Sequence, residues 1–298
     1  MLVVSDLQAK LRFQGQTKLP RWMGSAFRGG LGHQLKGILC PSIQEECSIC
    51  SEKEECFYYR VYEVKESKRG HAPPPKPLIV VPPFFGKEMN WRRGGDIHLR
   101  ILLLGEEGIR HAPHVIFSLI QLGMIGLGSE RAYGMNKFRV ISVTSQGETI
   151  FNGSEMRIPP PSIDVREVDP IEGDRFRVYF RTPYTGRTFP LGPREFLSRT
   201  RNRLIRFVNE YGDSSYVEEP EAKGRILRFE KHVHFLRRKS ERSGKMTLTG
   251  FTGIIDYEFS EIDEVGRWLL GVANLLGLGP DSSFGLGFVK VTRLEDSH

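Results

Sequence analysis

The chain has 298 residues, of which 39% are hydrophobic and 27% charged, and its net charge is +7. This length allows two domains with separate cores, and the composition is that of a soluble globular protein. No apolar run reaches membrane-spanning length and no charged-then-apolar secretion signal opens the sequence, so we expect a cytoplasmic protein. The modest excess of cations favours a polyanionic partner.

The first half of the chain alternates between strand and helix patterns. Pro113 fits the first turn of its helix, where a missing backbone N–H costs nothing. With the strand that ends at Val143, the order is β-α-β-β-α-β, with one further short strand between the two helices. The expected strands cover 2–14, 57–64, 78–81, 95–104 and the segment up to 143, and the expected helices cover 21–39 and 109–122.

All four cysteines follow the first expected helix, and they form a loop insertion at 40–56. Disulfides are disfavoured in the cytoplasm, whereas four thiolates in one short loop suit tetrahedral zinc. Cys47 and Cys50 form the CxxC knuckle of such a site. An iron–sulfur cluster is the less favoured alternative and unligated thiols are another. Either metal would be structural, because four protein ligands leave no coordination position open. The residues are Cys40, Cys47, Cys50 and Cys56.

The second half repeats the order of the first. A polar segment at 152–173, which contains three consecutive prolines, is the best linker, so we expect domains at 1–151 and 174–298. The fold class is α+β, with two tandem ferredoxin-like (βαββαβ) domains. The expected strands of the second domain cover 175–181, 226–236, 245–257 and the C-terminal segment, and its helices cover 194–211 and 260–275.

A glycine-rich loop occurs once in each half. Gly126, Gly128 and Gly134 recur 151 residues later as Gly277, Gly279 and Gly285. Each loop follows an apolar helix and leads into a strand, so it is neither a Walker loop nor a dinucleotide fingerprint. Glycine in this pattern indicates positive φ or a close approach to the backbone. The two copies indicate a duplicated domain.

Basic residues are concentrated in two parts of the second half. Six arginines and one acid lie between Arg187 and Arg206, and nine basic residues face two acids between Lys223 and Lys245. Arg199, Arg203 and Arg206 recur at helical spacing and are expected on one face. Arginine rather than lysine on such a face favours phosphate contacts, with a solvated helix face as the alternative.

Four stretches spread over nearly the whole chain resemble the RAMP superfamily of CRISPR-associated proteins, specifically the sixth Cas family. They are Gly24–Gly29 before a helix, the proline-rich segment into Gly94-Gly95-Asp96, Arg238–Arg242 followed by Lys245-Met246, and Phe284–Gly287. The resemblance implies two ferredoxin-like domains that bind precursor CRISPR RNA and cut it at the base of the repeat hairpin. It also implies RNA-binding roles for the arginine helix, the basic hairpin and the C-terminal glycine loop. These residues are Arg199, Arg203, Arg206, His232, His234, Arg237, Arg238, Lys239, Arg242, Lys245, Gly277, Gly279, Gly285 and Gly287.

The position of the candidate general base differs from that in many relatives, which have a His or Lys near the C-terminal loop. The segment 274–280 has neither, whereas His33 lies near the first helix, where family members often place a catalytic histidine. RNA cleavage without a metal needs a base for the 2′-hydroxyl, an acid for the 5′-oxygen and a cation for the phosphate. His33 with Lys36 and Arg28 supplies this set and would leave a 5′-hydroxyl and a 2′,3′-cyclic phosphate.

Two alternatives remain open. His232 and His234 point to one side of a strand and rival His33 as proton-transfer residues. The chain as a whole is either an endoribonuclease or a non-catalytic RAMP subunit that binds CRISPR RNA beside other effector subunits. We expect no catalytic cofactor, no membrane partner, and a monomer or homodimer.

Overall fold

The computed structural model of the chain describes residues 1–40, 46–65, 74–240 and 244–295. The chain divides into two compact units, Leu2–Ile163 (the N-terminal unit) and Asp164–His298 together with Met1 (the C-terminal unit). The boundary falls inside the segment 152–173. Each unit is a mixed α/β structure on antiparallel strands, so the expected two-part mixed architecture is confirmed.

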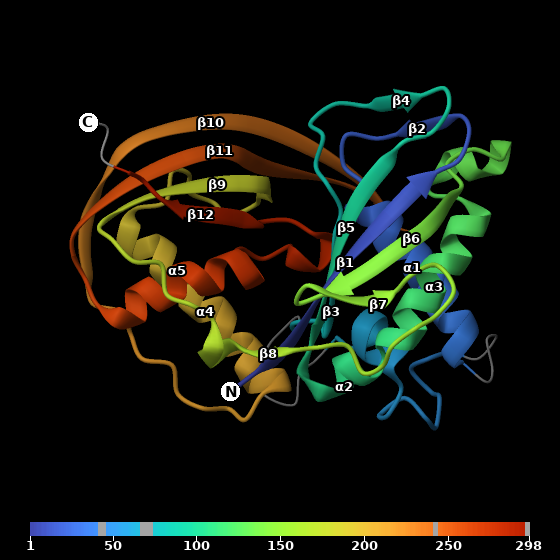
Figure 1. The fold of residues 1–298 in the computed structure, drawn as a ribbon, viewed down its shortest axis with the longest axis horizontal. Coiled ribbons are helices and arrows are strands. Elements are labelled where there is room, and N and C mark those ends of the chain that lie inside the picture. The colour runs from blue at the N-terminus through green and yellow to red at the C-terminus, as the bar shows by residue number, and fades with distance from the viewer. Residues whose placement is uncertain (41–45, 66–73, 241–243, 296–298) are drawn as a thin grey trace. The chain divides into compact units, whose positions relative to one another are not determined.

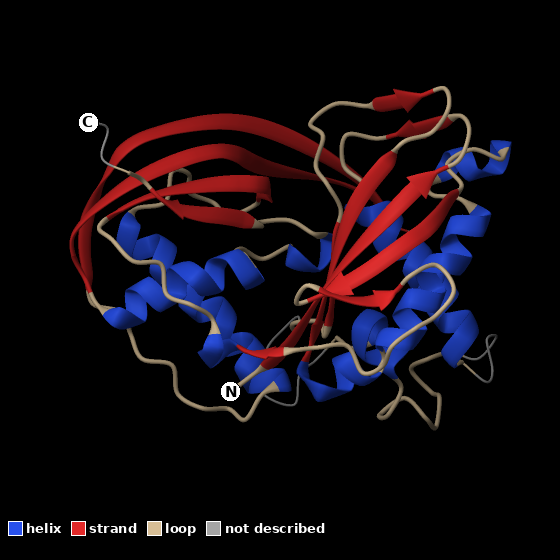
Figure 2. Cartoon of the chain, in the orientation of Figure 1, coloured by secondary structure: helices blue, strands red, loops and turns tan. Residues whose placement is uncertain are grey.

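The N-terminal unit has one main antiparallel sheet with helices against one face (Figures 1 and 2). Its strands are β1 (Val3–Phe13), β2 (Thr17–Leu19), β3 (Leu78–Val81), β4 (Met89–Trp91), β5 (Asp96–Leu104), β6 (Phe138–Ser145), β7 (Glu148–Phe151) and, at the boundary, β8 (Ile163–Asp164). Its helices are α1 (Gly24–Leu39), the π-helix η1 (Tyr59–Glu63), α2 (Gly105–Arg110), α3 (Ala112–Ile125) and the 3-10 helix η2 (Ser129–Tyr133). The strand order is β3-β5-β1-β6-β7, while β2 and β4 form a small separate sheet.

The central strand β1 shows why this sheet forms. Its side chains alternate, so that Leu7, Leu11 and Phe13 are buried while Arg12 is exposed. The buried set joins α1 and α3 in one core, where each large side chain contributes about 1.5–3 kcal/mol on full burial. The helices α1 and α3 approach closely because Gly30 has no side chain, since a Cβ there would lie 2.6 Å from Leu122 Cδ1.

The C-terminal unit repeats this plan with fewer strands. Its strands are β9 (Arg175–Tyr184), β10 (Ala222–Ser240), β11 (Gly244–Ile262) and β12 (Val289–Arg293), in the order β10-β11-β9-β12. Its helices are η3 (Val165–Glu167), α4 (Pro193–Tyr211), α5 (Glu264–Leu276) and η4 (Ser282–Phe284). Figure 2 shows α4 and α5 against one face of the sheet. The buried Tyr257 of β11 fixes that packing, because its hydroxyl donates to Leu191 O at 2.7 Å.

The hairpin of β10 and β11 is much longer than the rest of its sheet. Its two strands pair from Ala222–Ile262 to Ser240–Gly244, whereas β9 accompanies β11 only between Phe251 and Glu258. The distal part of the hairpin is therefore a two-stranded ribbon within the described C-terminal unit.

The strand expected at 57–64 is wrong, because this segment is helical. Phe57 and Val61 are buried four residues apart, and the rings of Tyr58 and Tyr62 stack with centroids 5.2 Å apart. Spacing by four places both pairs on helix faces. The short apolar run had the composition of a strand, and its period was misread.

No helix in the described ranges has both the length and the apolar character needed to cross a membrane.

Candidate functional site

His33 lies on the solvent side of α1, opposite the face that packs in the core. Its side chain is exposed and makes no hydrogen bond or ion pair within the described residues. Gly29 and Gly37 lie one helical turn to either side on the same face, and a Cβ at either would meet nothing within 4 Å. The backbone around His33 is therefore open, and a large anionic ligand can approach the imidazole without side-chain obstruction.

The two cations grouped with His33 are held by aromatic rings. The Arg28 guanidinium carbon is 4.7 Å from the Tyr62 ring centroid, and Lys36 Nζ is 5.8 Å from the Tyr58 centroid. Arg28 also donates to Val61 O at 3.1 Å, and the Tyr62 hydroxyl donates to Arg28 O at 3.0 Å. The two rings also stack on each other. The four side chains therefore form one stack in the order Arg28, Tyr62, Tyr58, Lys36, which we call the cation–ring stack.

The stack explains a further glycine of α1. A Cβ at Gly32 would lie 2.7 Å from Tyr62 Cε1, so only glycine lets the ring lie flat against the helix. Burial raises the pKa of Tyr62 to about 12, with Arg28 acting in the opposite direction. Arg28 and Lys36 thus join α1 to η1. The tyrosines were missed from sequence, although their spacing by four was a readable signal.

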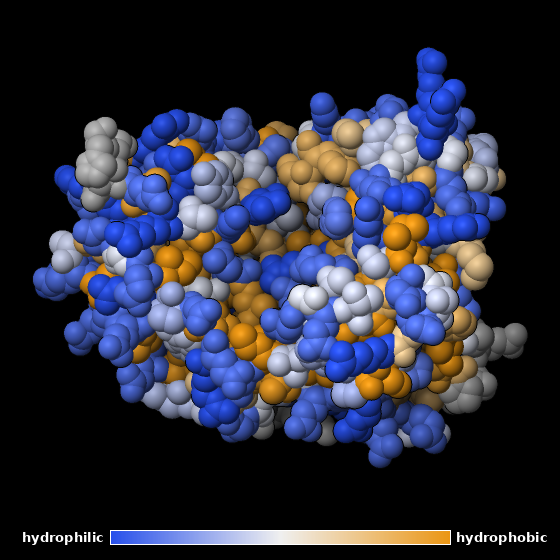
Figure 3. Space-filling model, in the orientation of Figure 1, coloured by the Kyte–Doolittle hydropathy of each residue, from blue (hydrophilic) through white to orange (hydrophobic). Residues whose placement is uncertain are grey.

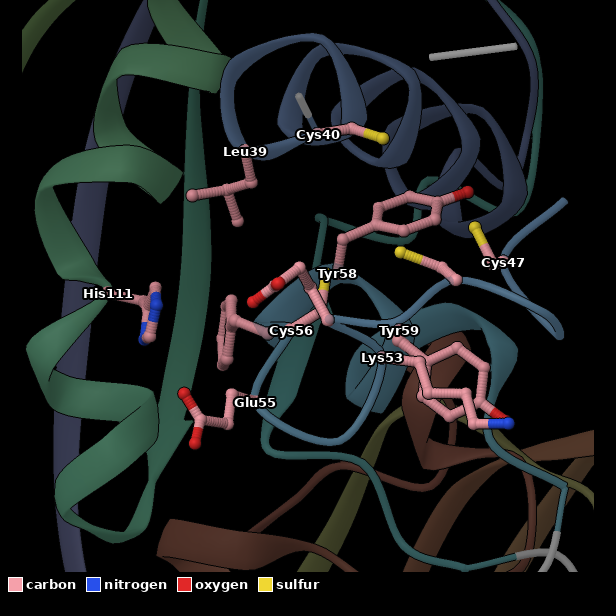
Figure 4. A pocket seen from close by; sticks show the side chains of 12 residues that line it. Leu39, Cys40, Cys47, Lys53, Glu55, Cys56, Tyr58, Tyr59 and His111 are labelled. Atoms are coloured by element: carbon pink, nitrogen blue, oxygen red, sulfur yellow. The ribbon is translucent and has the colours of Figure 1, made fainter. Parts of the chain in front are cut away.

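The four cysteines line one cavity of about 470 Å³ beside α1 and η1 (Figure 4). All four are free thiols of intermediate exposure. Burial raises the pKa of the Cys47 thiol, and Lys36 opposes this effect. His111 closes part of the wall, stacked on Phe57 with ring centroids 4.2 Å apart and interplanar angle 5°.

The predicted zinc site is not supported. Within the described ranges no three His, Cys, Asp or Glu side chains converge closely enough to hold a metal ion. The cysteine spacing correctly indicated that the thiols gather in one place, but in the structure they face a cavity rather than a common point. The same finding leaves the iron–sulfur alternative without support.

The basic hairpin presents some of the predicted RNA-binding side chains to solvent. His232 and Arg237 are exposed, while His234 is half-buried with Nε2 2.7 Å from Thr252 Oγ1. Exposed Phe229 and Phe235 stand on the same strand. Arg238, Lys239 and Lys245 belong to β10 and β11, and Arg242 lies outside the described residues.

The three arginines of α4 do not share a solvent face. Arg199 is 48% exposed and pairs with Glu195 at 3.1 Å, and Arg206 is half-buried. Arg203 is only 7% exposed and lies between the rings of Phe207 and Phe288. The expectation of a common arginine face is therefore wrong for Arg203. A turn of α4 places it toward α5 and the C-terminal loop, which the spacing alone did not indicate.

The two glycine loops share their hydrogen bonds at the 151-residue offset. Leu127 N donates to Asn136 O at 3.1 Å in the first, and Leu278 N donates to Gly287 O at 2.8 Å in the second. The four glycines of the C-terminal loop all have positive φ: Gly277, Gly279, Gly285 and Gly287. Asn136, at the position of Gly287, also has positive φ (59°), a conformation that asparagine tolerates.

Comparison with known proteins places the chain in a family. The profile of the AF_1859 N-terminal domain matches residues 2–163, and that of the AF_1859 C-terminal domain matches residues 176–291. An uncharacterized protein of Archaeoglobus fulgidus is 32% identical over 294 residues, covering 97% of this chain and 98% of its own.

Solved structures of low sequence identity share the fold. Thermus thermophilus Cas6 (TTHB231) has a TM-score of 0.51 at 14% identity, covering 98% of this chain and 99% of its own. The same Cas6 in a product complex has a TM-score of 0.53 at 15% identity, covering 98% and 99%. A Cas6-RT-Cas1 chain from a partial complex with Cas2 has a TM-score of 0.55 at 12% identity, covering all of this chain and 47% of its own. The chain belongs to the AF_1859 family, and its fold is that of the Cas6 proteins, as the resemblance in its sequence implied.

Proposed function

We propose that this protein is an endoribonuclease that binds CRISPR repeat RNA and cuts it into guide RNAs. The fold likeness to Cas6 structures over nearly the full length of both chains supports this proposal. The observation that carries it is His33, an exposed histidine between two open glycine positions on α1. Imidazole suits proton transfer near neutral pH, and the open helix surface admits an RNA backbone.

The proposed reaction is attack of a 2′-hydroxyl on the adjacent phosphate. His33 takes the proton of the 2′-hydroxyl as its oxygen bonds to phosphorus, and returns that proton to the 5′-oxygen as the bond between phosphorus and this oxygen breaks. Lys36 and Arg28 belong to the same helix and add positive potential near the phosphate. Because both cations are held in the cation–ring stack, their proposed role is to position α1 and stabilise charge, while His33 handles the proton. The products carry a 5′-hydroxyl and a 2′,3′-cyclic phosphate, and no metal takes part.

We propose RNA contacts for the exposed cations of the C-terminal unit. Arg199, His232 and Arg237 are accessible, and the hairpin adds exposed aromatic side chains on which bases can stack. Gly277, Gly279, Gly285 and Gly287 are proposed to shape the loop that faces the RNA, because the N–H groups of the first, third and fourth already donate to Ala273 O, Ser282 O and Pro183 O. Arg203 is excluded from this set because its guanidinium is buried.

We further propose that both units are ferredoxin-like domains. In each, four strands and two helices follow the order β-α-β-β-α-β, and the four strands lie in the spatial order second, third, first, fourth. The hydrogen bonds shared by the glycine loops support duplication of one ancestral unit.

The test is to incubate the purified protein with its own CRISPR repeat RNA in EDTA. Site-specific cleavage that leaves a 5′-hydroxyl supports the proposal. Tight binding without cleavage favours the alternative, a non-catalytic RAMP subunit of an effector complex. Cleavage only when a divalent cation is restored would contradict the metal-free mechanism.

A further inference from the structure

Five exposed cations gather at one end of the N-terminal unit, around β2, β4 and the start of β6. They come from three segments far apart in sequence, and we call them the cation patch. Figure 3 shows hydrophilic side chains projecting above the β4 region that Figure 1 labels. The members are Lys18, Arg92, Arg93, Lys137 and Arg139.

Hydrogen bonds hold the three segments together. The Asn136 side chain accepts from Lys18 N at 2.8 Å and donates to Lys18 O at 2.9 Å. Gln14 N donates to Lys137 O at 2.8 Å. β2 pairs with β4 so that Thr17 lies opposite Trp91, directly before the two arginines. The patch is therefore part of the folded unit rather than a chance meeting of loose side chains.

None of the five pairs with a carboxylate in the described part of the chain. The nearby acid, Asp96, is bound by Arg12 at 2.9 Å and by Lys10 at 3.3 Å. Hydrogen bonding to Arg12 is the main reason that the pKa of Asp96 falls to about 2. Arg139 lies directly opposite Arg12 in the sheet register, and Asp96 neutralises only Arg12 of these two.

Several other cations of this unit are paired with carboxylates. Arg100 pairs with Asp6 at 2.6 Å, Arg60 pairs with Glu107, and Arg157 pairs with Glu148. Single cations without a carboxylate among the described residues, such as Lys65 and Arg110, also occur in this unit, whereas the patch has five on segments that hydrogen bonds hold together. Such a group raises the local concentration of a polyanion.

We propose that the cation patch binds the phosphates of single-stranded RNA. This deepens the proposed function and rests on it, because the RNA concerned is the unpaired part of the precursor beside the repeat hairpin. Trp91 directly precedes the two arginines and is partly exposed, although its ring also packs on Phe13 with centroids 6.1 Å apart. A partly exposed aromatic ring beside cations favours a single strand, because bases stack on such rings. The cations also come from three short segments rather than one row spaced to follow a duplex.

The experiment measures equilibrium binding of a labelled oligouridylate by the full chain. It compares Arg92→Gln/Arg93→Gln with the matched control Lys65→Gln/Arg110→Gln. Both control residues are exposed and pair with no carboxylate among the described residues. Arg110 belongs to α2, at the other end of this unit (Figure 1). We expect about tenfold weaker binding in the patch variant, with the log–log salt slope flatter by about 0.7 for each lost contact. The control should stay within about twofold of the wild type.

The outcomes are separable from those of the proposed function, because oligouridylate binding does not depend on cleavage of a repeat. Equal affinity in the patch variant and the wild type overturns the inference. An equal loss in the patch variant and its control also overturns it, since net charge alone would then explain binding. A larger loss for a blunt RNA duplex than for the single strand overturns the single-strand assignment.

Discussion

The guanidinium of Arg203 donates a hydrogen bond from Nη1 to the carbonyl oxygen of Gly279 at 3.0 Å. Its Nε and Nη2 have no partner within the described residues, and no carboxylate pairs with it. Burial, helped by the nearby Arg206, lowers the pKa of Arg203 to about 9. Arg203, which was predicted to bind RNA, is thus buried and supports the C-terminal glycine loop. Arg199, one helical turn earlier, differs because its side chain is exposed.

Because Arg199 is exposed and Arg203 is buried, we expect their substitutions to have different effects on RNA binding. Arg199→Gln removes an exposed phosphate-binding candidate, so the log–log salt slope of affinity should flatten by about 0.7–0.9. Arg203→Gln should leave the slope unchanged, because the side chain is buried. Anisotropy titrations of repeat RNA at several salt concentrations measure both. A flatter slope in the Arg203 variant, with its fold intact by circular dichroism, would refute this assignment.

His33→Ala should slow cleavage of repeat RNA about a hundredfold or more, the usual contribution of a general acid–base residue. RNA affinity should barely change, because a neutral imidazole contributes little to phosphate binding. Single-turnover rates measure the effect, and His98→Ala, an exposed histidine on β5, is the control. Wild-type rates in the His33 variant would move the proposal to His232 and His234.

The two glycine loops should tolerate an added side chain only at positions where space exists. Gly287 has φ of +75°, and a Cβ there would lie 1.8 Å from Leu278 O. Gly128 in the first loop has φ of +73° but an open surrounding. Because its ψ is −164°, a region essentially restricted to glycine, Gly128→Ala should cost about 1–3 kcal/mol for the backbone alone. Gly287→Ala should cost clearly more, and chemical denaturation compares the two. Similar costs would show that the loop relaxes around the added methyl group.

The cation–ring stack predicts a pH dependence of stability. The folded-state pKa of Tyr62 is raised to about 12, above its ordinary value near 10, so its contribution is complete below pH 10 and is lost as the pH rises toward 12. The decline attributable to this phenol is about 2 kcal/mol. Tyr62→Phe should therefore lose less stability than the wild type over that interval. Parallel urea titrations at both pH values test this, and an equal decline would contradict it.

The sequence by itself determined the features that depend on local pattern. The alternation of β1, the helical periodicity of α4 and the 151-residue repeat of the glycine loops are all readable from residue order, because backbone period and positive φ restrict which residues fit. The exposed position of His33 also follows from the spacing of the apolar residues of α1.

Only the tertiary structure decided what each polar side chain meets. The segment 57–63 is a helix because Phe57 and Val61 join the core of the N-terminal unit while their tyrosine neighbours stack. Arg203 is buried because α4 turns it toward Phe288 and Gly279, far along the chain. The cation patch exists because Asn136 joins residues 118 positions apart. Contacts between distant segments set burial and charge pairing, and one sequence read alone does not contain them.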